Sequence, residues 1–433
     1  TEVVATRVFH QAAQLILTSS RFSSCRALVS QVAADKDAIL RANRRDCEHF
    51  IKVRDTPTRT LPTFALTPQW LDNLLPSIEG LAELPDPLSA STPLAKTHEE
   101  ISVSEVRVPL GMIGAVSRLR PRIMLDAIAM SVKSGNVVLV DCGSSVRETS
   151  RAFIESVQRA LTAVDLPHSV VVFVDDATTP LSQSAVGSSP SSSSQLATSQ
   201  WLKMHEYIDV GIVCGANRLF EFTSQHATMP LIRATGHVCS LYVDKDADFA
   251  MALRVVENSK FQRLNATNSI NNLLIHQEFP QREELLERLA QKGAILLGDA
   301  AVTAMFPAAG LATEEDWIGV QNGFSGFQRL CVRFVTKGMD EVVGFLSTYG
   351  SGQSDGIISS NKSTVETFLR RVDSACVFAN ASTRFSSGAC FGFGADLAVA
   401  TSRMHCRGPI SMKSLTTSKY VVRAVDMENG AAR

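Results

Sequence analysis

The hydroxyl groups of Thr267 and Ser269 lie in a polar segment that has the setting of a catalytic loop. A helix-forming stretch ends near Lys260, an asparagine-rich loop follows, and a strongly apolar, strand-like segment begins at Leu273. Loops between the helices and strands of a rigid scaffold often carry catalytic groups. A hydroxyl is a weak nucleophile unless a base activates it, and neither Lys nor His flanks this loop. We therefore favour Thr267 as a polar loop residue that bonds nearby backbone.

The nine cysteines offer no clear alternative nucleophile. They form no CxxC pair and no Cys/His cluster with zinc-like spacing, so no metal site is expected. Cys239 and Cys376 lie in apolar strands and are expected to belong to the core. Cys214 and Cys390 lie in turn or loop segments that could be exposed, but neither has a base nearby in the sequence. Free thiols fit a reducing compartment.

The bulk composition describes an ordinary soluble protein and excludes several classes of partner. A chain of 433 residues is expected to form two or three structural domains. Its net charge of −1 gives no reason to expect nucleic acid or a membrane surface as a partner. No apolar run approaches the roughly 18 residues needed to span a bilayer. The chain begins with Thr1, which a removed organelle-targeting peptide or a shortened chain would explain, so a mitochondrial or cytoplasmic location is expected.

Hydrophobic periodicity predicts the elements that must position these side chains. Residues 1–90 are predicted to be helical, and apolar alternation in residues 101–108 predicts an extended arm. Buried strands are then predicted at 136–141, 169–176, 207–217, 238–244, 293–299, 330–335 and 374–380. Strands that alternate with helices imply a parallel sheet with right-handed crossovers. The serine-rich residues 181–199 have few large apolar side chains and are predicted to be a disordered insertion.

Several longer stretches resemble γ-glutamyl phosphate reductase (glutamate-5-semialdehyde dehydrogenase), a member of the aldehyde dehydrogenase superfamily. They are VRVPLGMIGAV, YIDVGIV, LYVDKDADFAMALRVVENSKFQR, YGSGQSDGI, VDSACVFANASTRF and FGFGADLAVATSRMHCRGPISMKSLTTSKYVVR. The resemblance implies an α/β, aldehyde-dehydrogenase-like fold with a doubly wound cofactor domain, an α/β catalytic domain and a β oligomerisation arm. It divides the chain into N-terminal helices and a Rossmann-like cofactor domain (1–99 and 111–256), a catalytic-like domain (257–397) and the arm (100–110 and 398–433).

The resemblance also implies a reaction and the residues that carry it. Enzymes of this family reduce an acyl phosphate with NADPH on the way to proline. A cysteine thiolate displaces phosphate to form a thioester, which hydride then reduces to the aldehyde. On the family pattern, Thr267 falls on the position of this cysteine. Arg122 replaces the asparagine whose amide resembles the oxyanion donor of aldehyde dehydrogenases.

The cofactor positions implied by the resemblance are also altered. They fall on Lys133, Ser134, Gly135, Asp141, Gly143 and Gly215. Asp141 stands where a cation is expected and Cys142 where a glycine is. A carboxylate there repels a 2′-phosphate, but it can accept from a ribose hydroxyl and so permit NAD. Ala216 replaces a glycine where backbone approaches a pyrophosphate, and Arg233 replaces an acidic residue.

Three cationic or titratable residues remain near the family form in the C-terminal motifs. Arg384, His405 and Arg407 are predicted to form an anion-friendly pocket for a carboxylate or phosphate. The alternative is that their segments fold the edge of the catalytic domain and the oligomerisation arm.

The altered positions favour a catalytically inactive family member that serves as a structural or assembly subunit. It is expected to bind no cofactor and to form a homo- or hetero-oligomer through the β arm, alone or as part of a larger complex. One alternative is an active γ-glutamyl phosphate reductase of proline biosynthesis that uses NADP or NAD. Another is a non-catalytic sensor that binds a glutamate-like or nucleotide ligand.

Overall fold

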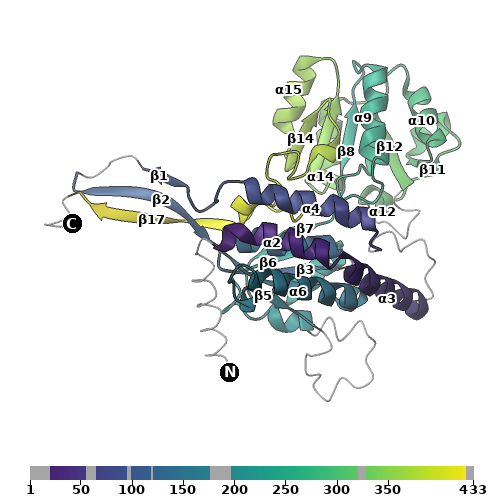
Figure 1. The fold of residues 1–433 in the computed structure, drawn as a ribbon. Helices are drawn as coiled ribbons and strands as arrows, with labels where there is room; N and C mark the ends of the chain where they lie inside the picture. Colours follow the sequence, from purple (N-terminus) through teal and green to yellow (C-terminus); the bar gives the residue numbers. More distant parts are fainter. Residues whose placement is uncertain are drawn as a thin grey trace.

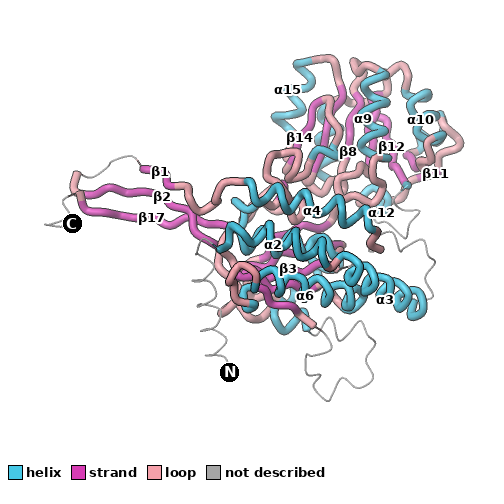
Figure 2. The backbone as a smooth tube through the Cα atoms, in the orientation of Figure 1, coloured by secondary structure: helices cyan, strands magenta, loops and turns pink. Residues whose placement is uncertain are grey.

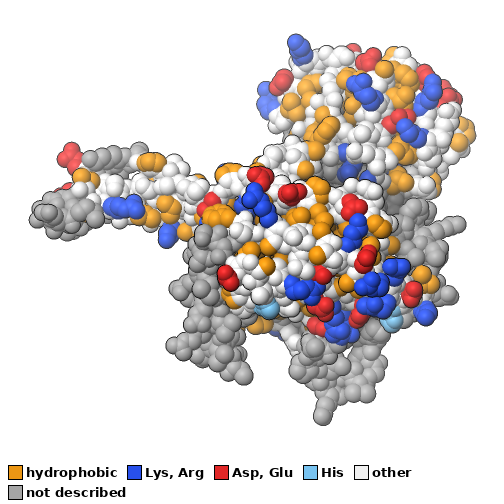
Figure 3. All heavy atoms as spheres, in the orientation of Figure 1, with side chains coloured by type: hydrophobic (Ala, Val, Ile, Leu, Met, Phe, Trp, Pro, Cys, Tyr) orange, Lys and Arg blue, Asp and Glu red, His pale blue; other side chains and the backbone are white. Residues whose placement is uncertain are grey.

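The protein has two α/β domains and a narrow arm that extends away from them (Figure 1). The computed structural model describes residues 20–54, 65–94, 99–118, 120–175, 197–319 and 328–425. Helices cover the sheets of both domains, whereas the strands of the arm have no helical cover (Figure 2). Acidic and basic side chains are mixed on the face shown in Figure 3, in keeping with the net charge of −1.

The first domain contains a five-stranded parallel sheet in the order β5-β4-β3-β6-β7. Its strands are β3 (Met112–Ser117), β4 (Val137–Asp141), β5 (Val171–Phe173), β6 (Val210–Gly215) and β7 (Leu231–Thr235). Its helices are α5 (Pro121–Lys133), α6 (Arg147–Thr162) and α8 (Asn217–His226). Every residue of β3 and β4 is buried, as expected for strands that helices cover on both faces. The first strand, β3, lies in the middle, so the sheet is doubly wound as predicted.

Three N-terminal helices complete the first domain. They are α2 (Ser20–Ala34), α3 (Lys36–Arg54) and α4 (Pro68–Glu83). Helix α4 begins where the Thr67 side chain accepts a hydrogen bond from the Trp70 backbone N–H, which satisfies a free donor of the first turn. Its apolar face packs on α2 and α5, while α2 and α3 pack on α6. The predicted helical character of residues 1–90 is confirmed for 20–54 and 68–83, but residues 84–90 form turns and a loop, and residues 1–19 lie outside the described ones.

The second domain contains a seven-stranded parallel sheet in the order β11-β10-β12-β9-β8-β13-β14. Its strands are β8 (Ser240–Val243), β9 (Asn272–His276), β10 (Ile295–Gly298), β11 (Gly310–Leu311), β12 (Arg329–Val335), β13 (Ser354–Ile358) and β14 (Cys376–Ala379). Its helices are α9 (Phe249–Phe261), α10 (Arg282–Gln291), α11 (Ala300–Met305), α12 (Glu314–Trp317), α14 (Met339–Tyr349) and α15 (Lys362–Arg371). The helix, loop and strand predicted around Thr267 are thus α9, residues 262–271 and β9.

The arm is an antiparallel sheet of three strands, β1 (Ser91–Pro93), β2 (Ile101–Pro109) and β17 (Thr416–Ala424), in the order β1-β2-β17. Strands β2 and β17 pair along their whole length, with Lys419 opposite Val106. The predicted arm is therefore present as a structural element.

Three predicted domain boundaries are wrong. Strand β1 was assigned to the N-terminal region 1–99, but it pairs with β2 in the arm. Strand β8 and the part of α9 up to residue 256 were assigned to the first domain, but β8 pairs with β9 and β13 inside the second sheet. The C-terminal residues 398–415 were assigned to the arm, but they pack on the first domain. This segment contains the short strands β15 (Val399–Ala400) and β16 (Gly408–Pro409) and the 3-10 helix η6 (Met412–Leu415). Most of its apolar side chains join the core of the first domain, whereas Val399 packs with Cys376 and Phe378 of the second.

The predicted serine-rich insertion lies mostly outside the described residues. Its last residues, from Ala197 onward, are helical and buried, and Trp201 continues this helix into the core. The prediction that 181–199 is disordered is therefore wrong for 197–199. None of the described helices has both the length and the apolar character needed to cross a membrane.

Candidate functional site

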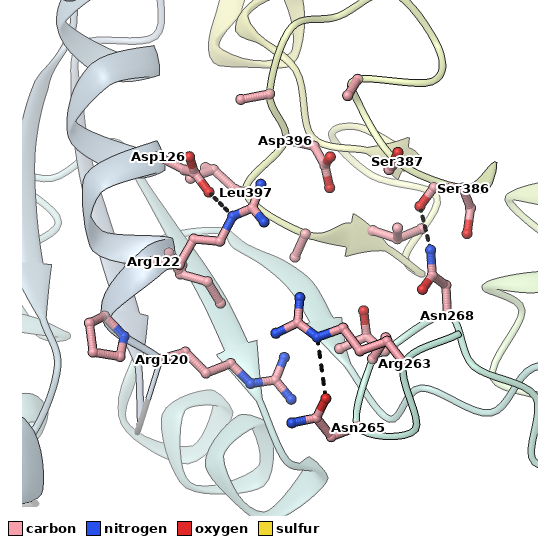
Figure 4. Close-up of a pocket in the computed structure, with 18 of the residues that line it drawn as sticks. Arg120, Arg122, Asp126, Arg263, Asn265, Asn268, Ser386, Ser387, Asp396 and Leu397 are labelled. Carbon is pink, nitrogen blue, oxygen red and sulfur yellow. Dashed lines mark hydrogen bonds and ion pairs between the residues drawn. The ribbon is translucent and has the colours of Figure 1, made fainter. Parts of the chain in front are cut away.

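A cavity of about 440 Å³ lies where the first turn of α5, the loop after α9 and the segment before β15 meet (Figure 4). It is thus built by both domains. Its lining residues are Ala65, Leu66, Trp70, Arg120, Pro121, Arg122, Ile123, Asp126, Arg263, Asn265, Ala266, Thr267, Asn268, Arg384, Ser386, Ser387, Ala389, Gly394, Ala395, Asp396, Leu397, Ala398 and Val399. A second hollow at the start of α4 shares Trp70, Arg122, Arg263 and Asn265 with this cavity.

Buried asparagine side chains fix the loop between α9 and β9. The Asn268 amide donates to the backbone oxygens of Arg384 and Ser386 at 3.3 and 3.1 Å. The Asn271 side chain accepts from the Cys239 backbone N–H at 3.2 Å, and Asn272 donates to the Trp317 carbonyl at 3.1 Å. These bonds satisfy backbone groups that the loop would otherwise leave unpaired. The hydrogen bonds of these asparagine side chains therefore hold the loop against the neighbouring segments of the chain.

Thr267 and Arg122 line the same cavity, as the resemblance implied. The Thr267 backbone oxygen accepts a weak hydrogen bond from the Cys239 thiol, with 3.6 Å between sulfur and oxygen. Its hydroxyl, however, has no hydrogen-bond partner among the described residues. The expectation that this hydroxyl bonds nearby backbone is therefore wrong, and the hydroxyl remains available to a ligand.

Four arginine side chains line the cavity, and they come from three places in the chain. Arg120 and Arg122 come from the start of α5, Arg263 follows α9, and Arg384 lies in the 3-10 helix η5 (Thr383–Phe385). In Figure 4 the guanidinium groups of Arg120, Arg122 and Arg263 point into one space. Burial lowers the pKa of Arg263, and the positive charge of Arg122 lowers it further. Burial likewise lowers the pKa of Arg120 and Arg384, and each also feels the charge of Arg263.

Only Arg122 among these four forms an ion pair within the described part of the chain. Its Nε lies 3.1 Å from Oδ2 of Asp126, one helical turn later. The Nε of Arg263 and that of Arg384 donate instead to the neutral side chains of Asn265 and Gln262, at 3.3 and 3.0 Å. The site therefore carries more positive charge than its own carboxylates balance, which favours an anionic ligand.

Two carboxyl groups, the buried Asp126 and the half-buried Asp396, also line the cavity. Burial raises the pKa of Asp126 to about 6, although the charge of Arg122 opposes this effect. Burial also raises the pKa of Asp396, whose carboxylate accepts a short hydrogen bond from the Gly388 backbone N–H. A raised carboxyl pKa within a cavity is typical of groups that exchange protons near neutral pH.

Lys133 and Ser134 do not face a nucleotide site, contrary to prediction. The Lys133 ammonium lies at the C-terminal end of α4 and donates to the carbonyls of Leu81, Ala82 and Leu84, at 2.9 and 2.8 Å for the last two. The Ser134 hydroxyl donates to the carbonyl of Met130 at 2.7 Å. Both side chains are fully buried. Lys133 binds carbonyls at the C-terminal end of α4, where a cationic donor is favourable. Ser134 binds a carbonyl at the C-terminal end of α5.

The Asp141 carboxylate is engaged by groups of the first domain. One carboxylate oxygen accepts from Arg118 at 2.8 Å and from the Gly143 backbone N–H at 3.2 Å. The other accepts from the Thr198 hydroxyl at 2.6 Å and from the Trp201 indole at 3.1 Å. Both oxygens are therefore occupied, and the group is buried. Arg118 balances the charge of this carboxylate, and the predicted repulsion of a 2′-phosphate and the predicted contact with a ribose stay predictions.

The three predicted cofactor glycines stand where the backbone conformation or a close neighbour leaves little room for a side chain. Gly135 has a φ of +81° in the turn after α5, where a Cβ would meet Pro109 at 2.9 Å. Gly143 has a φ of +74°, and a Cβ there would meet Arg118 at 2.4 Å. Gly215 ends β6 beside Leu219 of α8. Whether a nucleotide binds at these positions stays a prediction.

The predicted pocket of Arg384, His405 and Arg407 is not assembled. Arg384 lines the cavity, but the other two residues do not. His405 is exposed and its Nε2 lies 3.1 Å from the Ser414 carbonyl oxygen. Arg407 binds Asp373, with 2.8 Å between Nη1 and Oδ1. The sequence analysis missed Arg120, Arg263 and Asp126 as site residues, although Arg263 ends the quoted stretch LYVDKDADFAMALRVVENSKFQR and Arg120 lies two residues before Arg122.

The cysteines considered as alternative nucleophiles are mostly inert. Burial raises the pKa of Cys214 to about 12 and that of Cys376 to about 11. Burial also raises the pKa of Cys239 well above its ordinary value. A thiol is a poor nucleophile while it stays protonated. Cys390 is exposed, as the sequence allowed, but it does not line the cavity.

Comparisons with known proteins place the chain among a single group of relatives. No model of a protein family matches it. A gamma-glutamyl phosphate reductase from Bacillus mycoides (strain KBAB4) is 32% identical over 416 residues, which is 95% of each chain. One from Bacillus cereus (strain B4264) is equally similar over the same length.

Solved structures agree with the sequence relatives. The crystal structure of gamma-glutamyl phosphate reductase from Thermotoga maritima matches with a TM-score of 0.84 and 26% identity over 97% of both chains. An engineered glycolyl-CoA reductase with bound NADP+ shares only the fold, with a TM-score of 0.67 and 14% identity over 98% of this chain and 97% of that one. The chain therefore belongs to the gamma-glutamyl phosphate reductase family and has the α/β fold of the aldehyde dehydrogenase superfamily.

Proposed function

We propose that this chain is a non-reducing member of its family that acts as a structural or assembly subunit. The observation that carries the proposal is the composition of the cavity: no cysteine is among the described residues that line it. Thioester formation needs a soft nucleophile that can attack an acyl carbon and later leave. Thr267 offers a hydroxyl instead, and an ester accepts hydride less readily than a thioester does.

The cavity also lacks a base suited to activating this hydroxyl. Neither Lys nor His is among its described lining residues. Its carboxyl groups belong to Asp126, which Arg122 engages, and Asp396, which the Gly388 backbone N–H engages. A serine or threonine nucleophile depends on a neighbouring base to take its proton. We therefore expect no covalent step at Thr267.

The cofactor positions support the same proposal. Lys133 and Asp141 are used within the first domain, and neither offers a free group to a nucleotide. We propose that NAD(P)H binds weakly or not at all. The alternative is an active NAD(P)H-dependent reductase, which the near-complete match to gamma-glutamyl phosphate reductases favours.

An assembly role is supported by the free edge of the arm. β17 is the last strand of its sheet and pairs with β2 on one side only. Tyr420 and Val422 on this strand are 64% and 56% exposed. An unpaired edge with exposed apolar side chains favours pairing with another chain. We propose that the arm joins copies of this chain, or this chain and a related subunit.

The test combines turnover, cofactor binding and assembly on the full chain. We expect no oxidation of NADPH or NADH with γ-glutamyl phosphate above background, and no micromolar affinity for either cofactor by calorimetry. Sedimentation at micromolar concentration is expected to give an oligomer. Cofactor-dependent turnover that disappears in Thr267→Ala would overturn the non-reducing proposal, as would turnover that disappears in Cys390→Ser. A monomer that co-purifies with no other protein would overturn the assembly role.

A further inference from the structure

The tip of the arm presents apolar side chains on one face of its sheet. Residues directly opposite each other in an antiparallel pair lie on the same face. Val103 on β2 is opposite Val422 on β17, and its carbonyl accepts a hydrogen bond at 3.0 Å from the backbone N–H of Leu94, which follows β1. These three side chains therefore form a row across the arm. Together with alternate residues of β2 and β17 they make the arm-tip patch, which consists of Leu94, Ile101, Val103, Tyr420 and Val422.

The arm-tip patch has no apolar cover within the described part of the chain. Leu94, Tyr420 and Val422 are all exposed. No side chain of the patch belongs to an apolar cluster of the described residues, and no helix covers the arm in Figure 2. The other face of the arm tip carries the charged side chains of Lys419 and Arg423. An antiparallel sheet with one more apolar face ordinarily buries that face, so the patch is expected to be covered by another chain.

The area of the arm favours a second copy of this chain as the partner. Strand β2 has nine residues, so one face of the three strands offers at most about 400 Å², at about 3.3 Å per residue and about 4.8 Å between strands. A stable interface buries about 800 Å² on each partner. Two stacked arms, or an arm on a partner that has none of its own, supply only about half of this area. Reciprocal exchange doubles the area, because each copy gives one arm face and one receiving surface.

The receiving surface is the aromatic loop, which we define as residues 385–393. It exposes Phe385, Phe391 and Phe393, and no other stretch of this length in the described parts of the two domains exposes three large apolar side chains. The ring centroids of Phe391 and Phe393 lie 6.0 Å apart, edge to face. The Phe391 backbone N–H donates to the Ser387 carbonyl at 3.1 Å, so the loop has a fixed turn. Aromatic rings that a turn holds in solvent are typical of a protein interface.

The aromatic loop lies near the base of the arm, as reciprocal exchange requires. A Cβ at Gly394, directly after this loop, would meet Leu81 and Leu84 at 3.1 Å, at the C-terminal end of α4. Strand β1 follows α4 after a short loop, and the arm leaves the two domains from there (Figure 1). Two arms that run antiparallel therefore place the tip of each near the aromatic loop of the other copy.

We propose that a second copy of this chain receives the arm-tip patch on its aromatic loop, in a reciprocal exchange about a two-fold axis. This inference rests on the proposed assembly role, and it names the partner and both contacting surfaces. Ser387 and Ala389 of the aromatic loop also line the cavity. The partner's arm therefore supports one wall of the cavity from the outside.

Cysteine cross-linking tests the contact with a thiol that the chain already has. Cys390 lies in the aromatic loop and is exposed. In the full chain, Tyr420→Cys or Val422→Cys should give a disulfide-linked dimer on a non-reducing gel after a thiol oxidant is added. The same variants combined with Cys390→Ser should run as monomers on this gel. Lys419→Cys, on the other face of β17, should also run as a monomer.

A charged substitution in the aromatic loop tests the energy of the contact. Phe391→Asp should raise the dissociation constant of the oligomer more than about tenfold by sedimentation velocity, since buried aromatic anchors dominate interfaces. The matched control is Phe22→Asp on α2, because Phe22 is 41% exposed and Phe391 is 40% exposed, and it should leave sedimentation unchanged. Hydrogen exchange of the aromatic loop should be faster in Tyr420→Lys combined with Val422→Lys, which lacks the partner's arm.

The outcomes separate this inference from the assembly role. A parent chain that sediments as an oligomer, but forms no cross-link from either Tyr420→Cys or Val422→Cys, would overturn the inference and leave the assembly role in place. Sedimentation of Phe391→Asp like that of the parent would do the same. A parent chain that is monomeric at micromolar concentration would overturn both.

Discussion

The Arg118 guanidinium donates to the Asp141 carboxylate at 2.8 Å and so links the ends of β3 and β4. Arg118 follows β3 directly, and Asp141 is the last residue of β4. In doubly wound sheets, ligands commonly bind beyond these strand ends. Here the ion pair occupies that position together with Thr198 and Trp201. The Asp141 carboxylate thus connects the ends of β3 and β4 to Thr198 and Trp201 within the first domain.

We expect Asp141→Asn to lower the free energy of unfolding by about 2–4 kcal/mol. The asparagine NH2 group would face the hydroxyl of Thr198 and the indole N–H of Trp201, which both donate to this position now. Urea unfolding followed by fluorescence measures the change. The control Lys292→Gln breaks an exposed pair with Glu257 and should cost less than about 0.5 kcal/mol. An equally stable Asp141→Asn would contradict the structural role.

Lys133→Met should destabilise the protein by about 1–3 kcal/mol, because three carbonyls at the end of α4 lose their donor. The apolar replacement keeps most of the buried volume, so the loss reports the hydrogen bonds. Urea unfolding gives the magnitude, and hydrogen exchange should show the last turn of α4 opening first. If stability is unchanged while NADPH affinity falls, Lys133 is a cofactor ligand after all.

Asp355→Asn should flatten the dependence of stability on pH. Burial raises the pKa of Asp355 to about 6, although Ser374 and Ser240 donate to its carboxylate at 2.5 and 2.9 Å. A folded-state pKa above the unfolded value means that stability is greatest below the unfolded pKa and is lost as pH rises through about 6.

Asparagine can keep both contacts but cannot ionise. Between about pH 4.5 and 7 the parent should therefore lose about 1–2 kcal/mol more than Asp355→Asn does. Urea midpoints at the two pH values provide the comparison. A parent and variant that lose stability in parallel would show that Asp355 is not responsible.

Tyr420→Lys combined with Val422→Lys should dissociate the proposed oligomer without altering secondary structure. Both side chains are exposed on β17, and charges on an edge strand oppose pairing with another chain. Sedimentation velocity measures the oligomeric state, and far-ultraviolet circular dichroism measures the secondary structure. Leu311→Lys, at an exposed site on β11 of the second domain, is the matched control and should leave assembly intact. Unchanged sedimentation of the double variant would place the interface elsewhere.

Local sequence determined the elements and the family. Apolar runs such as VVLVD and VGIVCG are long enough only for buried strands, so the parallel sheets were predictable from periodicity. The alternation in ISVSEVRVP likewise predicted the arm strand β2. The replacement of a cysteine by Thr267 was visible from the resemblance, because motif positions are a property of the sequence.

Only the tertiary structure decided which partner each polar group has. Lys133 and Asp141 were expected to meet a nucleotide, but they meet α4 and Arg118, which no local pattern reveals. Strand β8 was assigned to the wrong sheet, since an apolar run does not specify its neighbours. Arg122 and Arg384 meet in one cavity although 262 residues separate them (384 − 122). Charge and burial at such a site arise from side chains that folding brings together, so the convergence of four arginines on one cavity appears only in three dimensions.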